Sequence, residues 1–151
     1  MNCTSGCVEQ RYPDCPVFLF GQSIEFMVSP FSKKKMPIQA LAGKSIAALA
    51  GIGNPSQFLK DIDNAGLKII KQLLYRDHHP YDQRDIDAVV DICHAMKIGV
   101  IVTTEKDLIR LEALNLPDNL IWAAQLVIKE DPPETFKTWL VDKLEAVDTA
   151  E

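Results

Sequence analysis

The chain has 151 residues, of which 47% are hydrophobic and 25% are charged, and its formal net charge is -5. This size and composition are typical of a single globular domain with its own hydrophobic core. The sequence contains no run of about 18 uncharged apolar residues, which argues against a membrane-spanning helix. Its acidic balance argues against a nucleic-acid binder, which normally presents a basic face.

The first fifteen residues, MNCTSGCVEQRYPDC, contain three of the four cysteines. Their spacing lacks the paired C-x2-C elements of a zinc site, so we expect no metal there. The segment has neither a basic start nor an apolar run, and it is not typical of a signal peptide. We therefore expect residues 1–15 to form a flexible leader with reduced thiols, in a cytoplasmic protein.

Residues 16–28, PVFLFGQSIEFMV, are rich in β-forming residues and predict one long or bent strand with a break at Gly21. The next segment, SPFSKKKMPIQALAGK, contains two prolines and three consecutive lysines, and it predicts a connector. Three lysines are fewer than an anionic lipid surface usually requires, so we interpret them as part of a solvated loop. Residues 16–44 are therefore expected to be a linker strand and connector.

From residue 45 onward, strands and helices are expected to alternate. The expected strands are 45–50, 67–74, 98–104 and 119–129. The expected helices are 55–65, the segment that follows Asp82, 104–114 and 132–147. This alternation predicts a three-layer α/β domain over residues 45–151, in which a parallel sheet carries helices on both faces, preceded by the linker β-strand. We expect a flavodoxin-like strand order.

Polar or glycine-rich stretches follow three of these strands: GIGNP at 51–55, YRDHHPY at 75–81 and TTEKD at 103–107. In a parallel sheet the carboxyl ends of the strands share one rim, and ligands bind beyond it. We therefore expect the candidate site at that rim. The segment AGKSIA is not a phosphate-binding loop, because Ile38 stands where its first glycine should be and the Gly-Lys-Ser precedes its strand.

The glycines of GIGNP have two possible roles. Gly51 and Gly53 could let the backbone approach an anion at the positive end of the next helix, which Asn54 is expected to cap. A tight turn that the fold itself requires explains both glycines equally well.

In TTEKD, Thr104 and Asp107 match a helix-start pattern, and Glu105 favours the helix dipole. Lys106 has no such structural role, and a lysine at the rim of a site is a plausible partner for an anion.

Asp77, His78 and His79 suggest proton chemistry, because an imidazole can hold or pass a proton near neutral pH and an adjacent carboxylate can orient it. A metal would need a third ligand, and His94 is badly placed on the following helix to supply one. A polar loop whose histidines cap neighbouring backbone explains the pattern equally well.

Three segments, in their order and spacing, resemble the carboxyl-terminal half of the tetraacyldisaccharide 4'-kinase family: LAGKSIAALAGIGNPSQFLKDID, YRDHHPYDQRDID and VIVTTEKDLIRL. The resemblance runs from about residue 16 to the end of the chain. It implies ATP-dependent phosphorylation, with Mg²⁺, of the 4'-hydroxyl of the lipid A disaccharide 1-phosphate precursor.

The resemblance also implies two α/β domains joined by a β-linker, with residues 17–28 as part of that linker. The amino-terminal domain would carry the phosphate-binding loop and a catalytic aspartate and would bind most of the ATP and Mg²⁺. We therefore expect no cofactor on this chain alone. The full-length family is expected at the cytoplasmic face of the inner membrane.

Carried onto this sequence, the resemblance implies that His78 pairs with the catalytic aspartate of the other domain, with Asp77 and His79 as supports. The residues implied to bind nucleotide or substrate are Gly51, Gly53, Asn54, Tyr81, Thr104, Glu105, Lys106 and Asp107.

This sequence contains neither the phosphate-binding loop nor the catalytic aspartate of the family, so we expect the chain to be inactive alone. Its expected partners are a P-loop domain or subunit and the lipid A precursor headgroup. Two alternatives remain: a binding module for an anionic glycolipid or a protein, and a small hydrolase or metal site. A linker strand without its other half would leave an open sheet edge, which predicts self-association through residues 17–28.

Overall fold

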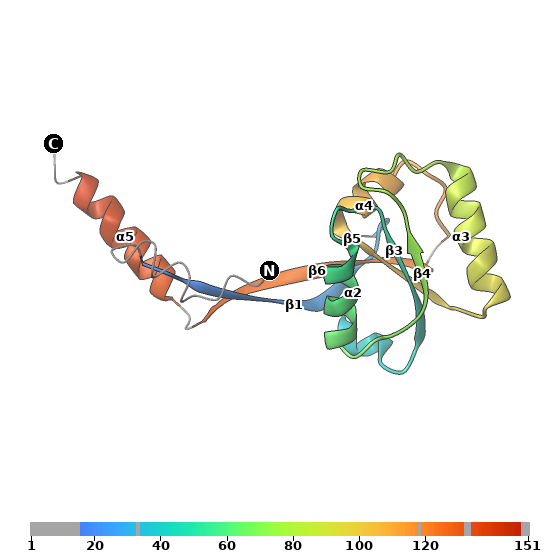
Figure 1. Cartoon of the computed structure of the whole chain (residues 1–151), viewed down its shortest axis with the longest axis horizontal. Helices are drawn as coiled ribbons and strands as arrows, with labels where there is room; N and C mark the ends of the chain where they lie inside the picture. Colours follow the sequence, from blue (N-terminus) through green and yellow to red (C-terminus); the bar gives the residue numbers. More distant parts are fainter. Residues whose placement is uncertain (1–15, 33, 118, 132–133, 149–151) are drawn as a thin grey trace. The chain divides into compact units, whose positions relative to one another are not determined.

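The structure, a computed structural model, describes residues 16–32, 34–117, 119–131 and 134–148. The leader expected at residues 1–15, with its cysteines, lies outside the described residues, and so does Lys33. The elements in chain order are β1 Leu19–Val28, β2 Lys35–Pro37, the 3-10 helix η1 Ile38–Leu41, β3 Ser45–Ala50, α2 Pro55–Asn64, β4 Lys68–Leu74, α3 Gln83–Ala95, β5 Val100–Thr104, α4 Glu105–Leu111, β6 Ile121–Asp131 and α5 Thr135–Asp148 (Figure 1).

The strands form one sheet in the order β2-β1-β6-β5-β3-β4. β4, β3, β5 and β6 pair in parallel, which confirms the predicted parallel core and its flavodoxin-like order. β1 and β2 pair antiparallel, so the whole sheet is mixed. The sequence did not predict β2, because three residues are too few to show a strand periodicity.

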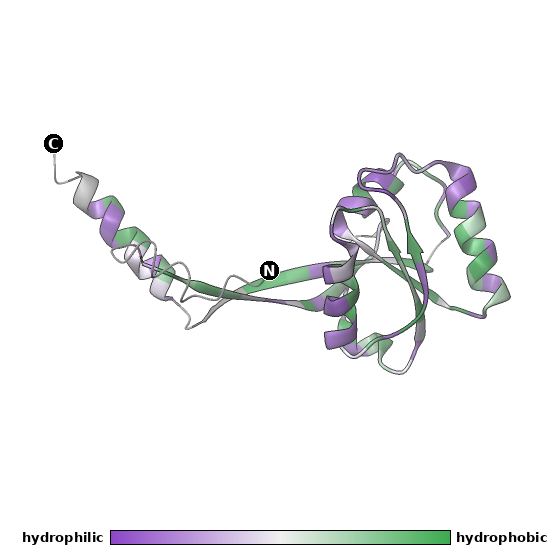
Figure 2. Ribbon diagram, viewed as in Figure 1, coloured by the Kyte–Doolittle hydropathy of each residue, from purple (hydrophilic) through white to green (hydrophobic). Residues whose placement is uncertain are grey.

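Both faces of the sheet are covered, as a three-layer α/β fold requires. Ile46 and Ala48 of β3 belong to one buried cluster, and Ala47 and Leu49 belong to the other. The helix residues that complete these clusters are Phe58 and Ile62 of α2 in the first, and Ile86, Val89 and Cys93 of α3 in the second. Figure 2 shows the hydrophobic residues running along the strands between these helices.

The helices α2, α3 and α4, which follow β3, β4 and β5, each begin at a side-chain cap. Asn54 and Thr104 each accept a hydrogen bond from the backbone N–H three residues further on. Asp82 forms a reciprocal capping box with Asp85. These contacts confirm the predicted helix starts, and they fix where each loop of the rim ends.

The structure differs from the sequence-based expectations at two points before residue 45. β1 runs through Gly21 without the expected break, and nothing lies within 4 Å of the place where a Cβ would stand. The expected connector contains β2 and η1, and Ile38 and Leu41 of η1 are buried in the core cluster beneath α2. Apolar burial therefore orders part of a segment that its prolines and lysines marked as a loop.

The described part of the chain divides into two compact units, residues 23–127 and the described residues before 23 and after 127. In the second unit, the Phe18 ring lies 5.2 Å from the Phe136 ring and 5.3 Å from the Trp139 ring, between centroids. Phe20 of β1 lies 5.7 Å from Phe136. This aromatic cluster packs α5 against β1. Among the helices of the described residues, none is long and apolar enough to cross a membrane.

Candidate functional site

The carboxyl ends of β3, β4 and β5 lie side by side, because Ala50 pairs with Leu74 and Leu49 pairs with Thr103. The chain passes from β4 across β3 to β5, so the strand order reverses between β3 and β5. In open α/β sheets, this switch point is where ligands bind. The structure therefore brings GIGNP, YRDHHPY and TTEKD together at one rim, as predicted.

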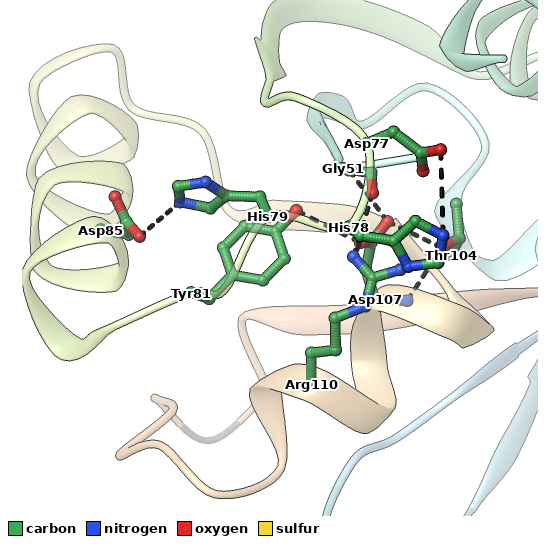
Figure 3. Close-up of polar contacts among 9 residues, drawn as sticks. All are labelled: Gly51, Asp77, His78, His79, Tyr81, Asp85, Thr104, Asp107 and Arg110. Carbon is green, nitrogen blue, oxygen red and sulfur yellow. Dashed lines mark hydrogen bonds and ion pairs between the residues drawn. The ribbon is translucent and has the colours of Figure 1, made fainter. Parts of the chain in front are cut away.

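Asp107 joins the three loops (Figure 3). Its side chain is fully buried and accepts four hydrogen bonds. Oδ2 accepts from the Gly51 N–H at 3.1 Å and from the Thr104 hydroxyl at 2.8 Å. Oδ1 accepts from the Tyr81 hydroxyl at 3.3 Å and from Arg110 Nη1 at 3.1 Å. A buried carboxylate needs its donors, because a buried negative charge without them is costly. The four hydrogen bonds therefore give Asp107 a structural role that holds the three loops together.

Close packing explains why residue 51 is a glycine. A Cβ on Gly51 would lie 2.7 Å from the Tyr81 hydroxyl oxygen and 3.3 Å from Asp107 Oδ1. Tyr81 is 8% exposed, and burial together with the Asp107 carboxylate raises the pKa of its hydroxyl. Gly51 and Tyr81 therefore serve the internal contacts of the rim, and a direct contact of either with a ligand stays a prediction.

The second glycine of the turn packs against the histidine loop. A Cβ on Gly53 would lie 3.1 Å from Asp77 Oδ2, so a larger residue would displace that carboxylate or be displaced by it. Asn54 is exposed, and its side-chain oxygen is used as the helix cap. Both residues lie at the rim, where the sequence placed them.

His78 projects from the rim. Its side chain is 85% exposed, and its Nε2 lies 3.9 Å from Asp77 Oδ2. Its backbone has φ +55°, a left-handed conformation that costs energy in any residue with a Cβ. The His78 N–H donates to the Gly51 carbonyl at 3.1 Å, which holds this conformation. The imidazole is therefore accessible to a group outside the chain and has one carboxylate beside it.

His79 lies on the other side of the loop, and Figure 3 shows the two imidazoles pointing in opposite directions. Its side chain is 21% exposed, and its Nε2 lies 2.8 Å from Asp85 Oδ2. Its ring stacks on Tyr75 at 4.5 Å and meets Tyr81 edge-on at 5.0 Å, between centroids. Burial alone would raise the pKa of Asp85, but hydrogen bonds from His79 and the Asp82 N–H lower it below its usual value. His79 thus connects the loop to the start of α3.

The family model described as Tetraacyldisaccharide-1-P 4'-kinase matches residues 11–145 of this chain. The chain belongs to this family. The tetraacyldisaccharide 4'-kinase of Syntrophus aciditrophicus is 43% identical over 94 residues, which are 60% of this chain and 25% of that protein. The corresponding protein of Halothermothrix orenii is 35% identical over 77 residues, 51% of this chain and 20% of that protein. The chain thus spans a quarter or less of these two curated relatives.

The crystal structure of LpxK from Aquifex aeolicus, described as an apo form in complex with ATP, superimposes with a TM-score of 0.58. The match covers 85% of this chain and 36% of that chain, at 20% sequence identity. It therefore supports the α/β fold. Together with the family match, it confirms the resemblance drawn from the three sequence segments.

The remaining predicted residues of this 4'-kinase family member lie on α4. Lys106 is exposed, and within the described residues its side chain makes no hydrogen bond or ion pair. Glu105 accepts a hydrogen bond from the Gln125 side chain at 3.3 Å. Lys106 therefore stays the rim cation that an anionic group could reach, whereas Glu105 connects α4 to β6.

The described residues of this rim show no oxygen cluster for Mg²⁺, and where ATP binds stays a prediction. Mg²⁺ prefers clustered oxygen ligands, but the Asp107 oxygens already accept four hydrogen bonds. Within the described ranges, no three His, Cys, Asp or Glu side chains gather closely enough to hold a metal. The Gly51 N–H, which could have bound a phosphate, donates to Asp107 instead.

Sequence analysis missed two residues of this family member's rim. Arg110 Nη1 donates to the Gly51 carbonyl at 3.0 Å as well as to Asp107, and its side chain is 24% exposed. Asp85 was predicted as a helix residue but not as the partner of His79. The position of Arg110, three residues after Asp107, was a signal for their ion pair but not for its contact with Gly51.

Proposed function

We propose that the chain provides the histidine-bearing rim of a tetraacyldisaccharide 4'-kinase. The reaction is ATP-dependent phosphorylation of the 4'-hydroxyl of the lipid A disaccharide 1-phosphate precursor. The observation that carries this proposal is the exposed His78 imidazole, with Asp77 Oδ2 at 3.9 Å, at the switch-point rim of a member of this family. Lipid A biosynthesis is the corresponding process.

The proposed catalytic role belongs to His78. Its accessible imidazole pairs with a carboxylate supplied by another part of the enzyme, and that carboxylate removes the proton of the sugar hydroxyl. Asp77 orients the imidazole from the same loop, and His79 supports the loop from the inside. An imidazole is suited to this role because it exchanges a proton near neutral pH.

Residues outside this chain would provide most of the ATP and Mg²⁺ binding, because the described residues contain no cluster of side chains that could hold a metal ion. The exposed Lys106 is available for an anionic group of the substrate or nucleotide. We expect the chain alone to transfer no phosphate and to require a P-loop domain or subunit. The proposed location is the cytoplasmic face of the inner membrane, which membrane fractionation of producing cells tests.

A reconstitution experiment tests this function. The chain is mixed with the part of the Syntrophus aciditrophicus relative that it does not match, and ATP-dependent transfer to lipid A disaccharide 1-phosphate is measured. We expect transfer by the mixture and not by either part. His78→Ala should reduce it by at least about 100-fold, the usual contribution of a positioned acid–base group. His94→Ala, which removes the exposed histidine of α3, is the control and should leave it unchanged.

Other outcomes point to the alternatives. Robust transfer by the chain alone contradicts the need for a partner. If His78→Ala leaves transfer unchanged while the chain still binds the lipid headgroup, the chain acts as a binding module for an anionic glycolipid. Stoichiometric zinc or manganese in the purified protein would support a metal-dependent hydrolase instead.

We also propose self-association through residues 17–28. Within the described residues, the ten-residue strand β1 pairs antiparallel with the three-residue strand β2 at residues 26–28. A long strand beside a short edge strand can add a strand from another chain. A dimer mass by light scattering at high protein concentration is the expected result, and a monomer mass there counts against it.

A further inference from the structure

Gly51 is held through both of its backbone polar groups. Its N–H donates to Asp107 Oδ2 at 3.1 Å, and its carbonyl accepts from Arg110 Nη1 at 3.0 Å. Arg110 Nη1 also donates to Asp107 Oδ1 at 3.1 Å, which closes a ring through the three residues. We call this ring the Gly51 clamp.

Residue 51 needs such a clamp because it is a glycine. A Cβ at residue 51 would lie 2.7 Å from the Tyr81 hydroxyl, so only glycine fits. Glycine has the widest backbone freedom of any residue and does not fix its own carbonyl direction. The Asp107 carboxylate and the Arg110 guanidinium restrict the Gly51 backbone, as a side chain at residue 51 would otherwise do.

The clamped carbonyl also holds His78. The Gly51 oxygen accepts from Arg110 Nη1 and from the His78 N–H at 3.1 Å, so both of its lone pairs are used. That N–H belongs to a residue at φ +55°, which an unconstrained loop would leave for a more favourable conformation. Arg110 therefore acts on His78 through one shared oxygen, without touching the imidazole in any described contact.

We propose that Arg110, with Asp107, is a positioning residue that fixes the Gly51 carbonyl and thereby holds the His78 imidazole in its projecting orientation. The inference rests on the proposed function for its catalytic consequence. Its structural consequence, the ordering of His78, does not depend on that function.

The test uses Arg110→Met, which keeps an unbranched apolar stem but removes the guanidinium and the two hydrogen bonds that its Nη1 donates. Hydrogen exchange of the His78 amide in the chain alone should accelerate by about five- to tenfold, the change expected for one hydrogen bond. In the reconstituted mixture, kcat should fall by about 100-fold, as a small misplacement of a catalytic group does. The KM for ATP should be unchanged. Arg110→Lys, which keeps the charge, should recover part of both losses.

Two further variants keep the test decisive. Arg84→Met removes an exposed arginine of α3 and should change neither readout. If Arg110→Met does not fold because the Asp107 charge is left unpaired, Asp107→Asn with Arg110→Met removes both charges together and should loosen the His78 amide in the same way.

The outcomes separate the two proposals. Unchanged His78 exchange and unchanged kcat in a folded Arg110→Met chain would overturn the positioning role. If His78→Ala leaves transfer intact, the proposed function fails, while faster His78 exchange in Arg110→Met would still establish the clamp.

Discussion

His78 and His79 are neighbours in the loop between β4 and α3, yet their surroundings differ throughout. The His78 side chain is 85% exposed and that of His79 is 21% exposed. His78 is held by its backbone N–H, whereas His79 is held by its ring, through Asp85 and the two tyrosines. The two histidines therefore differ in role: the His79 imidazole holds the loop in place, and the His78 imidazole stays accessible to a group outside the chain.

The two side chains also differ in direction. His78 has a left-handed backbone, and the His78 and His79 side chains leave the loop on opposite sides (Figure 3). His79 can then enter the space between Tyr75 and Tyr81 without drawing His78 in. An exposed histidine therefore lies beside a packed one in the same loop.

Removing the inner histidine should have the largest effect on stability. His79→Ala loses a hydrogen bond to a carboxylate and two aromatic contacts, and should lower the free energy of unfolding by about 2 kcal/mol. His78→Ala should change it by less than about 0.5 kcal/mol, because that side chain is exposed. Urea denaturation of both variants checks this. Equal losses would remove the distinction between the two histidines.

The backbone of His78 can be tested separately from its ring. His78→Gly should be about 1 kcal/mol more stable than His78→Ala, because glycine adopts positive φ without a Cβ clash. Lys97, at φ +55° in another loop, is the matched control. The free energy of unfolding of Lys97→Gly should exceed that of Lys97→Ala by a similar amount. Denaturation curves give both differences, and a more stable alanine at position 78 would contradict the left-handed assignment.

A smaller effect should appear with pH. Hydrogen bonds from His79 and the Asp82 N–H, outweighing burial, keep the pKa of Asp85 below its unfolded value. The stabilisation is therefore present above the unfolded pKa, about 4, and is lost as the pH falls through the lower folded pKa. The unfolding free energy of the wild type minus that of Asp85→Asn should shrink on acidification, by less than about 1 kcal/mol for this partly exposed pair.

A second mutation sharpens this result. In a His79→Ala background, the same Asp85→Asn difference should vary less with pH, because the hydrogen bond from His79 is gone. A pH dependence of unchanged size would show that His79 does not hold Asp85.

Local rules explain what the sequence could predict. Asn54, Asp82 and Thr104 cap helices through contacts three residues away, and the alternation of strands and helices fixes which loops share a rim. The family resemblance supplied the role that we propose for His78. These expectations required only local sequence patterns and the order of strands and helices, and no knowledge of which side chains pack together.

The contacts within the rim could not be predicted, because they join residues that are far apart in the sequence. Gly51 and Tyr81 lie 56 and 26 residues from Asp107 in sequence, so no spacing pattern links them. Arg110 bonds a carbonyl 59 residues away, and backbone carbonyls are present at every position. The positive φ of His78 has only a weak sequence marker, because His is enriched at positive φ but most non-glycine residues avoid it.

Carbethoxylation of the histidines, followed residue by residue by mass spectrometry, tests the central claim most directly. In the chain alone, His78 should react at a rate close to that of the exposed His94, and His79 several-fold more slowly. Adding the complementary part of the Syntrophus aciditrophicus relative should protect His78 and leave His94 unchanged. A His78 that reacts as slowly as His79, or that remains fully reactive in an actively transferring mixture, would contradict the account.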